Sequence, residues 1–96
     1  MYFITVFEHV KEWPHTGDQR TWGYYHKFME AQKAVENNMT DMREGCYDYA
    51  LIERIEPGIC AHSEQMQWYM WDSENGRYTE IDQPESMKRL CNFALG

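Results

Sequence analysis

The pattern of apolar and polar positions predicts several extended segments. Residues 2–7 are β-branched or aromatic and largely apolar on both faces, which indicates a strand in the interior of a sheet. Residues 20–25 have the Thr, Trp and Tyr content that is typical of a second strand. Residues 47–55 form a third apolar segment, which Pro57-Gly58 ends.

Two other segments have helical periodicity. The main helix is predicted from a stripe of apolar residues spaced three or four positions apart: Phe28, Ala31, Val35, Met39 and Met42. Asn37-Asn38 is a point at which this helix can break, and Gly45 favours its termination. A short amphipathic helix near the end of the chain is predicted from four further positions: Met87, Leu90, Cys91 and Ala94.

The clearest local signal is a hairpin between residues 66–71 and 77–81, whose turn contains Asn75-Gly76. A four-residue loop gives two favourable cross-strand pairs: Asp72 with Arg77, and Trp71 with Tyr78. The element order is therefore β-β-α-β-β-β-α. We predict a single α+β domain of 96 residues. Its antiparallel sheet has about four or five strands, with one main helix and the short C-terminal helix packed on it.

The chain is acidic, and its acidity is concentrated in the second half. It carries 16 Asp and Glu against 9 Lys and Arg, a net charge of −7. Residues 41–96 hold eleven of these acidic and five of the basic side chains. A negative field repels phosphate backbones, so direct nucleic-acid binding is disfavoured. The same field attracts a protein partner with a basic surface. The alternative is that the acidity serves solubility alone.

The cysteines indicate a reducing compartment. Cys46, Cys60 and Cys91 are odd in number, and none lies in a C-x-x-C pair. We therefore expect free thiols in the cytoplasm, and no metal site, because zinc needs about four converging ligands. The apolar run at the start is too short for a signal peptide, and no run approaches the roughly 18 apolar residues of a membrane helix. We expect no membrane partner and no cofactor.

No motif that carries catalysis is present. The six glycines are scattered, and neither H-E-x-x-H nor G-x-S-x-G occurs. Cys60 with His62, and Asp41 with Glu44, have the spacing for shared chemistry on one face of a strand or helix. We interpret the first pair as a buried thiol beside a surface histidine and the second as a solvated face. Three more carboxylates are also interpreted as solvated: Glu53, Glu56 and Glu64. No catalytic residue is predicted.

Seven Met and four Trp exceed what a small core needs. Residues 66–71 are apolar on both faces, so one face packs on the core and the other is solvated or covered by a helix or partner. Four large rings in and after the hairpin cannot all reach one core: Tyr69, Trp71, Tyr78 and Phe93. We expect some of them to bind a partner or to form a twofold homodimer. The alternative is that the surplus fills the core.

Several stretches follow a common pattern: Arg20–Tyr25, Phe28–Val35, Asn38-x-x-Asp41-x-x-Glu44, Tyr47–Glu53, Pro57–Ile59, Trp68-x-x-Trp71-Asp72 with Tyr78, and Pro84-Glu85. Together they resemble a family of small acidic proteins from Gram-positive gut bacteria and their mobile elements. The resemblance covers about residues 20–93 and carries over no activity. It points to residues that the fold does not require: Arg20, Asp41 and Glu44, with Trp22 and Tyr24 as stacking surfaces. An ion pair of Arg20 with Asp41 or Glu44 is the structural alternative.

We therefore predict a non-catalytic binding protein, an acidic protein–protein interaction module or inhibitor, encoded on a mobile element. One alternative is a nucleotide-type ligand binder, with bases stacked on aromatic rings and phosphates held by Arg20, Lys27 or Arg43. Another is a small enzyme that uses one of the two pairs named above. A pocket lined by Trp22, Tyr24 and Arg20 would favour the ligand binder. An exposed patch of Met and Trp beside carboxylates would favour the protein binder.

Overall fold

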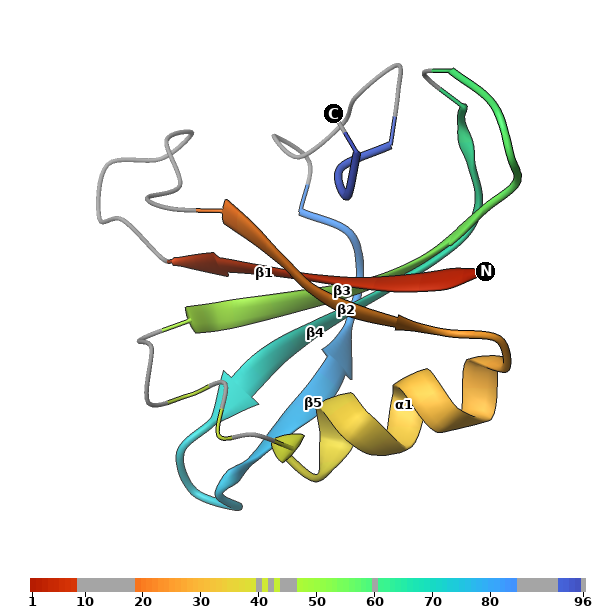
Figure 1. Ribbon diagram of the computed structural model, residues 1–96. Coiled ribbons are helices and arrows are strands. Elements are labelled where there is room, and N and C mark those ends of the chain that lie inside the picture. The colour runs from red at the N-terminus through yellow and green to blue at the C-terminus, as the bar shows by residue number, and fades with distance from the viewer. Residues whose placement is uncertain are drawn as a thin grey trace.

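The chain folds into a five-stranded antiparallel sheet with a helix on one face. The computed structural model describes these residues: 1–8, 19–39, 41, 43, 47–59, 61–84 and 92–95. Its elements are β1 (Tyr2–Glu8), β2 (Gln19–Tyr25), α1 (Phe28–Glu36), β3 (Tyr47–Ile55), β4 (Ser63–Asp72) and β5 (Arg77–Ile81). The strands lie in the order β2-β1-β3-β4-β5. Figure 1 shows α1 on one face of the sheet. The predicted α+β class and antiparallel sheet are confirmed, and β1 lies inside the sheet as expected.

One core lies between α1 and the sheet. Since successive side chains of a strand point to opposite faces, only alternate residues of each strand reach this side. The sheet contributes these residues: Ile4, Val6, Ala50, Ile52, Tyr69 and Tyr78. The helix buries three small side chains at a 3.6-residue period against them: Ala31, Ala34 and Val35. Small residues on α1 leave room for the two large tyrosine rings beneath it.

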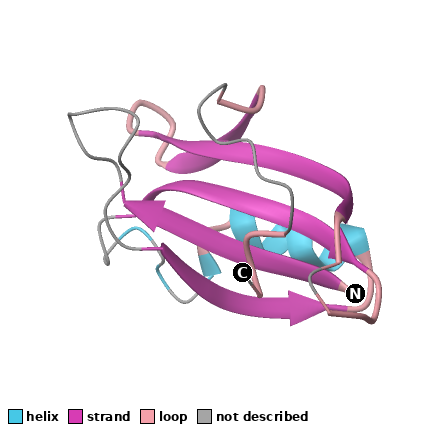
Figure 2. Ribbon diagram, turned by 90° about the horizontal axis from the view of Figure 1, so that it is seen from above, coloured by secondary structure: helices cyan, strands magenta, loops and turns pink. Residues whose placement is uncertain are grey.

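A second core covers the opposite face of the sheet. Phe7, Leu51 and Trp68 pack there with Phe93, which belongs to the segment at residues 92–95. The Trp68 ring lies 5.4 Å from the Phe7 ring and 5.6 Å from the Phe93 ring, measured between centroids. Figure 2 shows the end of the chain across this face, with the helix behind the sheet. The strands are apolar on both faces because each face has its own core.

The 92–95 segment is held on the sheet by hydrogen bonds to its backbone. The Glu53 carboxylate is fully buried and accepts bonds from the backbone N–H groups of Phe93 (2.9 Å) and Ala94 (3.0 Å). The Gln19 amide donates to the Phe93 carbonyl at 2.7 Å, and the Thr21 hydroxyl donates to the Ala94 carbonyl at 2.6 Å. Side chains from β2 and β3 thus satisfy the backbone of a segment that is not part of the sheet.

The predicted C-terminal helix is not shown by the described residues. Three of its four apolar positions lie outside the described residues, in the range 85–91. The described part of the segment, 92–95, forms bends and no helix. The backbone N–H groups of Phe93 and Ala94 donate to the Glu53 carboxylate and not to the carbonyl groups of a preceding helical turn.

The main helix is shorter than its apolar stripe predicted. α1 begins at Phe28 as expected but ends at Glu36, and the Asn37 N–H donates to the Lys33 carbonyl at 3.0 Å. Asn38 follows with a φ of 49°, the left-handed conformation that asparagine tolerates and that ends a helix. Asn37-Asn38 is therefore the break that the sequence indicated. Met39 lies beyond it with 49% of its surface exposed.

The hairpin between β4 and β5 has the predicted register. Asp72 pairs with Arg77 and Trp71 with Tyr78, whose rings make an edge contact at 5.1 Å. The Asp72 carboxylate accepts bonds from the backbone N–H of Glu74 and from the Asn75 side chain. These hydrogen bonds lower the pKa of Asp72, and the bond from the Asn75 side chain has the largest effect. The turn is therefore fixed by its own polar residues.

Candidate functional site

An open groove of about 620 Å³ lies between the end of α1 and β5. Residues from the helix, β4, the turn and β5 line it: Gln32, Glu36, Tyr69, Asn75, Arg77, Tyr78, Thr79 and Glu80. Because β5 is the last strand of the sheet among the described residues, one side of the groove is a strand edge that no described strand pairs with. We call the surface made by β5 and this groove the β5 edge.

The groove has acidic walls and a neutral floor. Glu36 on α1 and Glu80 on β5 are its two carboxylates, and the Arg77 guanidinium contacts Glu36 at 3.2 Å. Tyr69 forms part of the floor, and its hydroxyl accepts a bond from the Gln67 amide at 2.8 Å. Burial raises the pKa of Tyr69 to about 12, with the Glu36 and Glu80 carboxylates adding to it and a Gln32 hydrogen bond opposing it. Tyr69 therefore stays a neutral phenol at neutral pH.

Negative charge continues along the hairpin. Residues 72–82 carry four carboxylates and one basic side chain, Arg77. The carboxylates are Asp72, Glu74, Glu80 and Asp82. All except Asp72, which is partly buried, are exposed. Since Arg77 already pairs with Glu36, the β5 edge presents a net negative field to a partner.

The other side of the β5 edge carries two exposed methionines. Met66 and Met70 alternate with Tyr69 along β4, so they lie on the sheet face opposite α1, with exposed fractions of 42% and 41%. A hollow of about 320 Å³ lies beside Met66 at the end of β5. Its lining mixes apolar and acidic side chains: Met66, Gln67, Trp68, Glu80, Ile81, Asp82 and Gln83. Flexible methionine side chains beside carboxylates make an adaptable contact surface.

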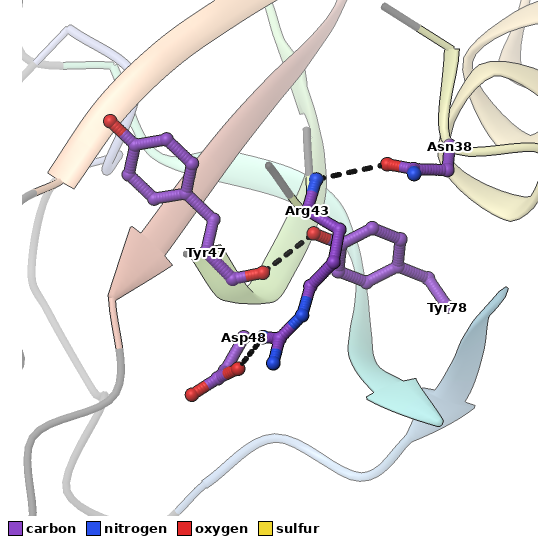
Figure 3. A network of polar contacts seen from close by, with 5 residues as sticks. All are labelled: Asn38, Arg43, Tyr47, Asp48 and Tyr78. Carbon is purple, nitrogen blue, oxygen red and sulfur yellow. Dashed lines mark hydrogen bonds and ion pairs between the residues drawn. The ribbon is translucent and has the colours of Figure 1, made fainter. Parts of the chain in front are cut away.

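A polar network fixes the segment after α1 to the sheet (Figure 3). The Arg43 guanidinium pairs with the Asp48 carboxylate, and the Arg43 backbone N–H donates to the Asn38 side chain at 3.0 Å. The Tyr78 hydroxyl donates to the Tyr47 carbonyl at 2.6 Å. Burial raises the pKa of Tyr78 to about 12, although the positive charge of Arg43 acts in the opposite direction. This tyrosine is thus a neutral structural donor.

The predicted site residues fall into two groups at opposite edges of the sheet. Tyr69 and Tyr78 lie under the groove, and Trp71 lies beside Tyr78 with the Arg43 guanidinium 5.5 Å from its ring centroid. Trp22 belongs to β2, at the far edge, and makes an edge contact with the Tyr47 ring at 5.8 Å.

The predicted polar residues do not gather around Arg20. Its guanidinium lies 5.4 Å from the Trp22 ring centroid, and within the described residues it makes no ion pair. The Asp41 carboxylate instead accepts a bond from the Asn38 side chain at 3.0 Å. Glu44 lies outside the described residues. Tyr24 is 57% exposed and its ring contacts Phe3.

A smaller hollow of about 250 Å³ lies by the β2 edge. It is lined by Ile4, Trp22, Gly23, Tyr24, Tyr25, Ala34 and Met39. Trp22 and Tyr24 therefore share a pocket as the ligand hypothesis required, but Arg20 does not line it. No Lys, Arg or His is among the described residues that line it, so these residues offer no cation to a phosphate.

Two carboxylates, Glu53 and Glu36, were not identified correctly from the sequence. Glu53 was expected on a solvated face, but it is buried under the 92–95 segment. Glu56 and Glu64 are exposed as expected and pair with Arg54 at 2.8 and 2.9 Å. Glu36 was not singled out, although its position four residues after Gln32 places both on one helix face.

No protein-family model, curated protein or solved structure matches the chain. The family resemblance therefore stays a prediction. No helix in the described part of the chain is long and apolar enough to cross a membrane. Among the same residues, no three His, Cys, Asp or Glu side chains gather as metal ligands would. All three cysteines lie outside the described residues.

Proposed function

We propose that this chain is a non-catalytic binding module that captures a protein partner with a basic surface at the β5 edge. The observation that carries the proposal is the open groove of about 620 Å³. It has Glu36 and Glu80 in its walls, and along one side runs a strand edge that no described strand covers. Arg77 is the basic residue in its lining, and Glu36 already neutralises it. A basic side chain is the complement of such a surface.

Charge and apolar contact have separate roles in this proposal. Three carboxylates of the hairpin, Glu74, Glu80 and Asp82, are exposed, so they increase the rate of encounter more than they hold the complex together. Met66 and Met70, each about two-fifths exposed, supply the apolar contact that slows dissociation. An inhibitor would act by occupying its partner's basic surface in this way, and we propose the cytoplasm of the host of a mobile element as its setting.

The ligand-binding alternative has weaker support. The hollow that Trp22 and Tyr24 share measures about 250 Å³, below the roughly 300–1,000 Å³ of most small-molecule sites. Three cations were proposed to hold phosphates. Arg20 lies over the Trp22 ring, Arg43 pairs with Asp48, and Lys27 is exposed but is not among the residues that line the hollow.

Selection of random displayed peptides on the immobilised protein tests the proposal without a known partner. Peptides enriched in Lys and Arg should bind the wild-type chain and lose binding to Glu80→Lys. Glu30→Lys is the matched control, because Glu30 is an exposed carboxylate of α1 that does not line the groove. Enrichment of acidic or uncharged peptides, or equal loss with both variants, would contradict a basic partner at the β5 edge.

A further inference from the structure

We infer that the partner binds the β5 edge as an added sixth strand, an extended segment in which basic residues alternate with apolar ones. This inference rests on the proposed function and specifies the form of its partner. The first support is the backbone of β5. Residues 77–81 pair with β4 on one side, and no described strand pairs with the other side. Alternate N–H and C=O groups of an edge strand point outward and accept another strand.

The two edges of the sheet differ in their readiness for such pairing. β2, at the other edge, has a register shift opposite Ile4 and Thr5, and its Gln19 and Thr21 side chains hold the 92–95 segment. A bulge of this kind bends an edge strand and hinders pairing. The five pairs between β5 and β4 run without a register shift. β5 is therefore the regular edge, about 17 Å long at 3.4 Å per residue.

The side chains beside β5 specify the pattern of the added strand. An extended segment directs successive side chains to opposite faces. On the helix side they would meet the groove with Glu36 and Glu80. On the other side they would meet the apolar surface of Met66, Met70 and Ile81. A segment of alternating basic and apolar residues satisfies both faces in one register.

A second copy of the chain is the competing occupant of this edge. Pairing β5 with β5 would bring two hairpins together, each with four carboxylates against one arginine in residues 72–82. The net negative charge of the two hairpins would make them repel each other, which favours a basic segment over a second copy.

The test uses a short synthetic peptide in which lysine and valine alternate. The first control is a peptide of the same composition with its lysines and valines in separate blocks. The second control is a pair of peptides with the alternating sequence, in which either the odd-numbered or the even-numbered backbone nitrogens are methylated. Methylation removes the N–H donors that strand pairing needs and leaves the charge and the side chains unchanged. Dissociation constants are measured by calorimetry. Protection of the amides of residues 77–81 is measured by hydrogen exchange.

The alternating peptide should bind and slow exchange at residues 77–81. The dissociation constant should be about tenfold higher or more for at least one of the two methylated peptides and for the block peptide. Glu80→Gln should weaken binding severalfold, and Glu30→Gln should leave it unchanged. Equal binding of the methylated and unmethylated peptides would overturn strand addition while leaving a basic partner in place. If no lysine-rich peptide binds, the proposed function fails as well. Concentration-dependent protection of residues 77–81 without peptide would show that a second copy is the occupant and would overturn the inference.

Discussion

Replacing Glu53 with glutamine changes one atom of the buried carboxylate that holds the 92–95 segment. The two carboxylate oxygens accept three hydrogen bonds, from the Ser63 hydroxyl and from the N–H groups of Phe93 and Ala94. A glutamine side chain keeps one acceptor oxygen and turns the other position into a donor. At least one N–H or O–H group then faces another donor in a buried site.

The size of the effect follows from these contacts. A hydrogen bond to a charged group contributes about 1.5–3 kcal/mol, and a buried donor left without an acceptor adds a desolvation cost of similar size. Removing the buried charge offsets part of this loss. We expect Glu53→Gln to lower the free energy of unfolding by about 2–3 kcal/mol. For a chain of 96 residues, whose whole stability is about 5–14 kcal/mol, this is a large share.

Urea unfolding followed by tryptophan fluorescence measures the change, because Trp68 packs directly on Phe93. Glu56→Gln is the matched control. Glu56 is an exposed carboxylate paired with Arg54 at 2.8 Å, so its replacement should change stability by about 0.5 kcal/mol or less. If Glu53→Gln is no more destabilising than the control, the buried carboxylate does not hold the segment.

Other predictions concern alkaline pH, the hairpin turn and the cysteines. The pKa values of Tyr69 and Tyr78 are raised to about 12, whereas an unfolded tyrosine has a pKa of about 10. The free energy of unfolding should therefore fall as the pH rises from about 10 to about 12. An absorbance titration should show that these two tyrosines ionise last, together with unfolding. Gly76 has a φ of 64°, so Gly76→Ala should lower the free energy of unfolding in urea by about 1 kcal/mol. Gly23 has open space around it and no positive φ, so Gly23→Ala should leave the stability almost unchanged. Equal effects of the two substitutions would refute backbone strain at Gly76. A thiol reagent under denaturing, non-reducing conditions should titrate all three cysteines, and a count of one would show a disulfide.

The local features of the fold could be predicted from the sequence. The β-branched and aromatic content of residues 47–55 located β3, and Asn75-Gly76 located the turn and with it the register of β4 and β5. The length of α1 was overestimated, because the apolar stripe continues past Asn38 while the backbone there is left-handed. Periodicity alone does not register such a backbone reversal.

The features that depend on distant contacts could not be predicted. Hydrophobic residues on both faces of residues 66–71 suggested a partner, but Phe93 covers part of the second face from outside the hairpin. Strand alternation places Glu53 on the same face as Leu51, which was a signal of burial. Its two backbone donors, however, lie 40 and 41 residues further along the chain. The Glu36–Arg77 contact joins residues 41 positions apart, so the groove had no local signature.

The most direct test of the central claim is to map where a lysine–valine peptide contacts the chain. Amide chemical shifts of the labelled protein are recorded during a titration with the peptide at low and at high salt. We predict shifts concentrated on β5, on the end of α1 around Glu36 and on Met66 and Met70, with weaker binding at high salt. Shifts concentrated on β2 around Trp22, or binding that salt leaves unchanged, would contradict it.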